Sequence, residues 1–451
     1  MATATGGAPG AADDGEDIDG FFSTARTAGR EEAVELPSDG YTHYLFDHDD
    51  PQVAAFRGMT YEEFARDRYD SNPFLRDLLA SWDALYAEPF VGVTSDGVVR
   101  EGLYALPDEP VTDDAQLVAA AHDLLAVLTE DERGRVTYPL DAPDWRGWSN
   151  PEFVFHRNGL RLEDLDDAAA DAALAVVRAS LSPEGYARVR EAMALNAFLG
   201  RLVDLPAIMN ERSYWFSLFG TPEVGGAWGW QLFGHHVDVN FVTVGGRHVV
   251  APVFLGAEPA LSDGERPPIF EARERVAVEL ASSLTPEQRE HAVVYASVLD
   301  PAMPEGRLHP ADERHVAGAF RDNRVVPYEG IRATGLDAAQ RGLLRAVVED
   351  FLLLLQEPQR ALTLADVDAH LEDTWLAWYG ATDGSQPTYV RIQSPVLLVE
   401  LDHHAGVWLT NRLPARFHVH STLRLPNGND YGRAYVEQWK ARRDHKPYTG
   451  S

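Results

Sequence analysis

Two histidines one residue apart, His418 and His420, lie in the stretch FHVHSTLRLPNGNDYG, whose alternating character indicates a β-strand. Side chains alternate between the faces of a strand, so both imidazoles and the guanidinium of Arg424 are expected on one face. Two imidazoles at this spacing can converge on one metal ion. Taken alone, such a pair is more often two polar residues on a solvated strand face. A metal site therefore needs support from elsewhere in the chain.

The stretch GHHVDVNFVTV gives that support. Read as a continuous strand, it places His236, Asp238 and Asn240 on one face and His235 on the other. His236 is thus a candidate third ligand, and Asp238 a candidate ligand, orienting residue or catalytic base. His235 is either a buried histidine bonded to a backbone carbonyl or, if a bulge follows Gly234, a further ligand.

A third cluster, LVELDHHAGVWL, places Asp402 and His404 on one face of a predicted strand and His403 on the other. Asp402 and the two histidines form either a polar turn before the following glycine or part of the metal shell. Asp402 is accordingly a candidate catalytic residue. Arg424 is either an ordinary surface arginine or a clamp for a substrate carboxylate, which its planar fork can bind through two hydrogen bonds.

The chain has no cysteine, which excludes disulfides, thiolate metal sites and a cysteine nucleophile. A metal must then be bound by histidine and carboxylate ligands. Three histidines with open positions suit iron, copper, zinc or manganese, and two histidines with a carboxylate suit non-haem iron. A divalent transition metal is the expected cofactor, with iron or copper favoured and zinc or manganese as alternatives.

The 451 residues carry 71 acidic against 39 basic side chains, a formal net charge of −32. This excess of negative charge argues against binding to nucleic acid or to an anionic membrane, and favours a small-molecule substrate that is not strongly anionic. The N-terminal stretch lacks a basic region followed by an apolar one, so no secretory signal is predicted. The expected location is the cytoplasm.

Residues 1–38 are rich in glycine, alanine and acidic residues and predict a disordered leader, followed by a single large domain over 39–451. A hairpin is expected over 88–106, and helices over 113–128 and 164–180. Further helices are expected to begin after Thr60, Ser182, Thr285 and Asp337, which have N-cap spacing. Strands are predicted over 228–254, with a turn at Gly245-Gly246, and over 389–425, where Pro395 indicates an edge strand or a bulge. The pattern indicates an α+β fold, with a mainly antiparallel sheet that carries the histidine clusters and packs against a large helical layer.

Four blocks of the chain resemble a known family: FSLFGTPEVGGAWGWQLFGHHVDVNF, VVAPVFLGAEPA, YVRIQSPVLLVELDHH and HVHSTLRLPNGNDYG. Together they resemble the bacterial family catalogued as domain of unknown function 3500. The resemblance implies that six residues belong to the family's shared pattern: His235, His236, Asp402, His418, His420 and Arg424. It supplies no reaction. The chain departs from the family at Glu258, where asparagine is more usual, and at His403-His404, where many members carry Asn-Thr.

These observations favour a metal-dependent enzyme acting on a small organic molecule. Its expected ligands are His236, His418 and His420, with His235 as an alternative or additional one, and its expected catalytic residues are Asp238, Asp402 and Arg424. An oxygen-using oxidoreductase is the preferred reaction class. The alternatives are a hydrolase that uses a metal-bound water, a non-catalytic small-molecule binding module, and metal-free acid/base catalysis by the aspartate and histidine cluster.

Overall fold

The computed structural model describes residues 40–261, 267–309 and 311–444. Within these residues, twelve strands form one sheet in the order β1-β3-β4-β5-β6-β12-β11-β10-β9-β7, with β2 beside β3 and β8 beside β9. The strands are β1 Thr137–Tyr138, β2 Leu160–Arg161, β3 Tyr214–Gly220, β4 Ala227–Gly234, β5 Val237–Val244, β6 Arg247–Ala257, β7 Val293–Tyr295, β8 Ile331–Arg332, β9 Trp375–Tyr379, β10 Tyr389–Gln393, β11 Leu398–His403 and β12 Val419–Arg424.

Two meanders make up the sheet, β3–β6 and β9–β12, and the antiparallel pair β6–β12 joins them. In this pair Gly256 lies opposite His420, and Phe254 lies opposite Thr422. The joint therefore brings the two histidine-rich blocks of the sequence together. Neighbouring strands in each meander run antiparallel, which allows connections as short as the two residues between β4 and β5.

The prediction of an α+β fold is confirmed, but the prediction of a mainly antiparallel sheet is wrong, because the sheet is mixed. Near its two ends, β1 runs parallel to β3 and β7 runs parallel to β9. Both short parallel strands follow directly on helices, α6 (Glu130–Val136) and α10 (Pro286–Ala292), which return the chain to the sheet. Long segments join each parallel pair, residues 139–213 between β1 and β3 and residues 296–374 between β7 and β9, because a tight turn cannot join parallel strands.

The helices follow the predicted N-cap signals closely. Thr60, Thr285 and Asp337 each form a capping box, and Ser182 accepts a hydrogen bond from the backbone N–H of Gly185. The helices are α2 Pro51–Ala54, α3 Tyr61–Ser71, α4 Pro73–Ala87, α5 Ala115–Val127, α6 Glu130–Val136, α7 Asp167–Ser180, α8 Pro183–Leu202, α9 Glu271–Ser283, α10 Pro286–Ala292, α11 Ala338–Phe351, α12 Glu357–Ala369 and α13 Arg433–Asp444.

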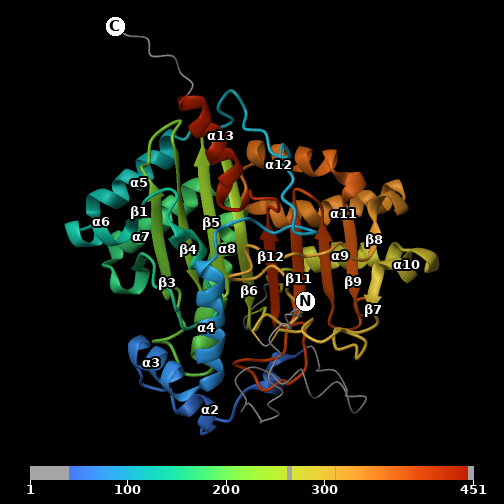
Figure 1. The fold of residues 1–451 in the computed structure, drawn as a ribbon. Helices are drawn as coiled ribbons and strands as arrows, with labels where there is room; N and C mark the ends of the chain where they lie inside the picture. Colours follow the sequence, from blue (N-terminus) through green and yellow to red (C-terminus); the bar gives the residue numbers. More distant parts are fainter. Residues whose placement is uncertain (1–39, 262–266, 310, 445–451) are drawn as a thin grey trace, which may run out of the picture.

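The sheet has an apolar face and an unusually polar face, and both are buried. Trp230 packs on the apolar face, where its indole N–H donates to Ser180 of α7, and α8 and α9 lie behind the sheet in Figure 1. The helix α4 crosses in front of the opposite face (Figure 1). On that face the strands present a continuous band of buried polar side chains, which are Gln231, Asp238, Asn240, Tyr389, Arg391, Glu400, Asp402, His420, Thr422 and Arg424. Buried polar groups need hydrogen-bond or ionic partners within the protein, so a ligand or metal site is expected in this layer.

Two local predictions are wrong. The segment 88–106 forms no hairpin, because Thr94 instead pairs with the backbone of Arg324 and Val326 and so joins the loops that cover the polar face. Pro395 marks neither an edge nor a bulge: it lies in the tight turn between β10 and β11, which Ser394 closes by donating from its backbone N–H to Leu397.

Among the described residues, none of the helices combines the length and the apolar character that crossing a membrane requires. The acidic leader predicted over residues 1–38 lies outside the described residues. The extent of a single domain over 39–451 stays a prediction.

Candidate metal centre

Three imidazoles meet at the β6–β12 joint through the same ring atom. The Nε2 atom of His420 lies 3.0 Å from Nε2 of His418 and 3.2 Å from Nε2 of His236. All three side chains are buried, with exposed fractions of 1 to 4%. The sequence-based prediction placed the same three histidines together, and the structure brings them within ligand distance of one another.

His236 reaches the joint by a route that strand alternation does not predict. His235 and His236 form the two-residue turn between β4 and β5, in which Gly234 pairs with Val237. His236 adopts a left-handed backbone with φ of 65°, which few residues other than glycine and asparagine favour. Its backbone N–H donates to Oδ1 of Asn150 at 3.1 Å, which fixes the turn. The prediction that His236 shares a strand face with Asp238 is therefore wrong, because the turn interrupts the alternation.

Gly256 makes room for two of the three rings. A Cβ atom at this position would lie 2.7 Å from Cδ2 of His420 and 2.9 Å from Cδ2 of His236, closer than side-chain atoms tolerate. The backbone N–H of Gly256 also donates to the carbonyl of His236 at 2.9 Å. Glycine at this point in β6 thus allows the turn and β12 to bring their imidazoles together.

The ring of His418 is oriented by the loop that follows β11. Its Nδ1 donates to the carbonyl of Ala405 at 2.6 Å, so in the neutral ring Nε2 carries the lone pair that faces the other histidines. Glu258 fixes this loop in turn, because its carboxylate accepts the backbone N–H groups of Val407, Trp408 and Leu409. The bonds to Glu258 therefore hold in place the loop that carries the carbonyl of Ala405, and this carbonyl sets the tautomer of His418.

The geometry of the triad fits a metal ion better than a hydrogen-bonded cluster. Since Nε2 of neutral His418 has no proton, one proton on Nε2 of His420 can serve only one of its two contacts. Imidazole nitrogens bound to one ion at about 2.0–2.1 Å lie about 2.9 to 3.4 Å apart in octahedral or tetrahedral geometry. The observed separations of 3.0 and 3.2 Å fall within that interval.

Burial keeps these rings neutral. It lowers the pKa of His418 to about 4 and holds the pKa values of His236 and His420 well below their ordinary value, and neighbouring histidines lower the latter two further. A neutral imidazole is the form that binds a cation, so the rings are ready as ligands at neutral pH.

A cavity of about 50 Å³ lies beside the triad, with room for on the order of four water molecules. Its lining includes Trp82 of α4, Asn150, His235 and two carboxyl groups, Glu152 and Glu258. Burial raises the pKa of each of these two carboxyl groups to about 7. The cavity thus combines prospective metal ligands with two groups that can exchange a proton near neutral pH.

His235 lines the cavity but does not belong to the triad. Its Nδ1 lies 2.8 Å from Oδ1 of Asn196, whose amide nitrogen is already committed to Asn210 and Ser213. Nδ1 therefore carries the proton, and Nε2 is left as a lone pair. The ring stacks on His236 at 3.9 Å between ring centroids, so it supports that ligand from the side.

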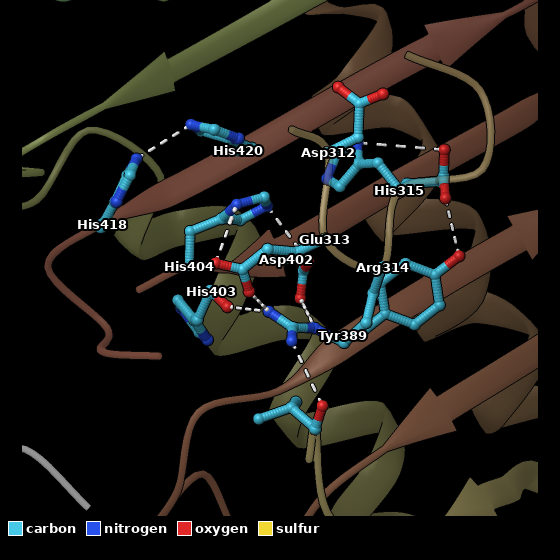
Figure 2. Close-up of polar contacts among 12 residues, drawn as sticks. Asp312, Glu313, Arg314, His315, Tyr389, Asp402, His403, His404, His418 and His420 are labelled. Carbon is cyan, nitrogen blue, oxygen red and sulfur yellow. Dashed lines mark hydrogen bonds and ion pairs between the residues drawn. The ribbon is translucent and has the colours of Figure 1, made fainter. Parts of the chain in front are cut away.

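Asp402 lies one strand away from the triad, in β11 opposite His420. One carboxylate oxygen accepts from Nε of Arg314 at 2.7 Å, and the other lies 3.1 Å from Nε2 of His404 (Figure 2). The ring of His404 stands 3.9 Å from that of His420, between ring centroids. His403 points the other way, where it accepts from the backbone N–H of Thr388. The prediction that these two histidines face opposite sides matches the observed contacts.

Asp238 and Arg424 do not face the cavity, in contrast to their predicted catalytic roles. Asp238 is fully buried between β4 and β6, where burial raises its pKa well above the ordinary value and favours the protonated form. Arg424 uses four of its five N–H donors on the carbonyls of Ala317 and Gly318 and on two carboxylates, Asp322 and Asp430. These bonds hold residues 317–322 against the sheet, and Arg424 has no pair of N–H donors left to bind a substrate carboxylate.

Four residues beside the site carried no sequence signal strong enough to single them out: Glu152, Glu258, Glu313 and His315. His315 and Glu313 come from the long segment between β7 and β8, which has no periodicity to interpret. Glu258 was visible only as a departure from the family pattern.

The model of the family described as protein of unknown function (DUF3500) matches residues 111–433, which is more than half of the chain. The chain belongs to this family. No curated protein and no solved structure matches it. The DUF3500 match includes the three triad histidines, Glu258 and Asp402, whereas α4 and Trp82, which close one side of the cavity, precede the matched residues. The resemblance noted from the sequence blocks is thereby confirmed.

Proposed function

We propose that this DUF3500 chain is a metal-dependent enzyme that acts on a small organic molecule, with a divalent transition metal bound by His236, His418 and His420. The observation that carries the proposal is the convergence of three buried Nε2 atoms, 3.0 and 3.2 Å apart, beside a cavity. Three neutral nitrogen ligands leave coordination positions for a reactant, as catalytic metal sites require.

The surrounding residues have distinct tasks in this proposal. Ala405 sets the tautomer of His418, and Asn150 holds the turn that presents His236. Glu152 and Glu258, whose pKa values burial raises to about 7, donate or accept protons at the cavity wall. His235 lines the same cavity, where its unprotonated Nε2 atom can accept a proton. None of these tasks requires Asp238 or Arg424.

Oxygen-dependent oxidation is the first candidate reaction. A site built of imidazoles without thiolates suits iron or copper, and either metal would supply the activation of dioxygen. The side chains that line the cavity are mostly buried, which favours chemistry that must be shielded from bulk water. The substrate is expected to be neutral or cationic, because a net charge of −32 repels strongly anionic molecules.

Hydrolysis is the second candidate, and the two carboxyl groups favour it. A general acid or base works best with a pKa near the working pH, and burial raises both Glu152 and Glu258 to a pKa of about 7. Zinc or manganese at the triad would supply an activated water. A cytoplasmic location remains part of the proposal, together with the absence of nucleic-acid and membrane partners.

Elemental analysis of anaerobically purified protein tests the metal. Wild type is compared with the His418→Ala, His420→Ala double variant and with His291→Ala, a control at an exposed position in α10. We expect the double variant to lose one equivalent of transition metal that the control retains. Fewer than about 0.1 equivalents in wild type after reconstitution would instead leave a metal-free binding module or acid/base catalyst.

Oxygen consumption by the reconstituted protein separates the two reaction classes. A panel of neutral and cationic small molecules is tested with iron, copper, zinc and manganese in turn. Substrate-dependent oxygen uptake that the double variant abolishes supports oxidation. Product formation with zinc or manganese and without oxygen uptake supports hydrolysis and overturns the first candidate.

A further inference from the structure

Beside the triad, three more buried residues converge in the same layer: His315, Asp402 and His404 each offer one ligand atom within 4.8 Å of the other two. We propose that these residues bind a second divalent metal ion, so that the centre holds two ions side by side. The second ion is a site of its own, and its part in catalysis rests on the function proposed for the triad.

The first argument is that Nε2 of His315, Oδ2 of Asp402 and Nε2 of His404 are buried and make no hydrogen bond within the described part of the chain. The contact nearest to a hydrogen bond is the 3.1 Å approach of Oδ2 of Asp402 to Nε2 of His404, two atoms of the cluster itself. The exposed fractions of these side chains are 2% for His315, 0% for Asp402 and 3% for His404. Buried polar atoms are nearly always satisfied, and one unsatisfied group costs about 1–3 kcal/mol. Each of these three residues thus carries an unsatisfied buried atom, and the three residues offer ligand atoms within 4.8 Å of one another, so a shared cation would satisfy them.

The second argument is that the opposite end of each side chain is held in place. Oδ1 of Asp402 accepts from Nε of Arg314 at 2.7 Å, which directs Oδ2 toward His404 (Figure 2). Nδ1 of His315 lies 2.8 Å from Oγ1 of Thr422, which leaves Nε2 toward the cluster. Ligands of metal sites are commonly fixed by such outer contacts, because these set the orientation of the ring and the tautomer.

The third argument concerns charge. Arg314 lies between two carboxylates, those of Asp402 and Glu313, and one guanidinium cannot neutralise both. A divalent ion beside Asp402 supplies the missing positive charge. Since two histidines and one carboxylate are the donors, iron(II), manganese or zinc suits this site better than copper(I), which prefers softer ligands.

The two sites are close enough to share a reactant. The rings of His404 and His420 stand 3.9 Å apart between centroids, and the backbone N–H of His404 donates to the carbonyl of His418 at 2.8 Å. His404 also lines the cavity beside the triad. The cavity therefore borders the triad and one ligand of the second site, so a reactant in it could contact both ions, as substrates of two-metal enzymes do.

Cobalt(II) titration of metal-free protein, followed by visible absorption and elemental analysis, tests the second site without any assay of activity. The proteins are wild type, His315→Ala, the His418→Ala, His420→Ala double variant and the exposed control His291→Ala. We expect two equivalents in wild type and in the control, and one in each of the other two. Loss of a direct ligand should weaken its own site by more than about 100-fold, since loss of an outer contact alone costs 10–100-fold.

The outcomes separate the two proposals. One equivalent in wild type that disappears in the double variant, but not in His315→Ala, overturns the second site and leaves the triad standing. One equivalent that disappears only in His315→Ala overturns the triad and keeps the His315, Asp402 and His404 site. No binding in any protein overturns both. His315→Gln, which keeps more of the side-chain volume, replaces His315→Ala if circular dichroism shows that the alanine variant has not folded.

Discussion

Ala405 accepts a hydrogen bond from Nδ1 of His418 at 2.6 Å, and this contact sets which nitrogen of the ring faces the cavity. A backbone carbonyl can only accept, so the proton is fixed on Nδ1 and the lone pair on Nε2. Because the carbonyl belongs to the backbone, no substitution at residue 405 removes it directly. The position of the loop therefore determines the chemistry of the histidine.

We predict that Gly256→Ala weakens metal binding by the triad about 10- to 100-fold, the range found when the surroundings of metal ligands are disturbed. The added Cβ would lie 2.7 and 2.9 Å from the rings of His420 and His236 and force them apart. Calorimetric titration with zinc measures the loss. Gly342→Ala in α11 is the matched control, because its Cβ meets nothing within 4 Å. Equal affinities in the two variants would show that the rings do not bind as placed.

The protein should become less stable as the pH rises, and Glu152→Gln should reduce that trend. Burial raises the pKa of Glu152 from 4.5 to about 7 in the folded state. Protonation of this carboxyl therefore stabilises the fold fully below about pH 4.5, and the gain is lost as the pH rises through 7. The gain is at most about 3 kcal/mol for a shift of this size.

Urea denaturation of metal-free protein between pH 4.5 and 8 measures this dependence. The difference in unfolding free energy between wild type and Glu152→Gln should change with pH, whereas the difference for Glu290→Gln, at an exposed position in α10, should not. A constant difference for both variants would mean that Glu152 is ionised across the whole range.

Arg424→Lys should lower the free energy of unfolding by about 3 kcal/mol, because a lysine cannot replace the guanidinium fork that joins Asp322, Asp430 and two carbonyls. Arg100→Lys is the control, because Arg100 forms an exposed ion pair with Asp96. This substitution should change the free energy of unfolding by less than about 0.5 kcal/mol. If Arg424→Lys instead keeps full stability and raises only the KM of a substrate, the arginine is the clamp that the sequence suggested.

Thr422→Val should weaken cobalt binding at the His315, Asp402 and His404 site about 10-fold and leave the triad unchanged. The substitution keeps the shape of the side chain and removes only Oγ1, which lies 2.8 Å from Nδ1 of His315. The two affinities are compared in the same cobalt titration. Equal weakening of both sites would point to a general disturbance of β12 rather than to the orientation of one ligand.

Strand and helix signals in the sequence predicted much of the frame of this site. Alternation correctly placed His420 and Arg424 on one face of β12, and N-cap spacing located the starts of α3, α8, α10 and α11. These predictions succeed because they depend on contacts within a few residues. Alternation and N-cap spacing carry no information about which distant strands pair, so they could not predict the pairing of His420 with Gly256.

The predictions failed where the backbone departs from regular geometry. A two-residue turn at His235-His236 requires φ above zero, for which glycine, asparagine or aspartate is the usual signal, so the sequence was interpreted as one continuous strand. His315 enters the centre from a loop whose course depends on Arg314 and Arg424, and no spacing rule describes that. The sequence suggested a substrate-binding role for Arg424 because it does not show the partners of this side chain. Two of them, Asp322 and Gly318, lie 102 and 106 residues away in the chain.

The joint between β6 and β12 has a consequence for how the chain acquires its site. His236 and His420 are 184 residues apart, and only the pairing of the two meanders brings their nitrogens to 3.2 Å. Contacts of such long range form slowly, because loop closure must precede them. An ion that binds the triad has no matching site on either meander alone, so it stabilises only the chain in which both are folded and paired. Metal uptake would then show that both meanders are folded and paired, whether or not the protein catalyses a reaction.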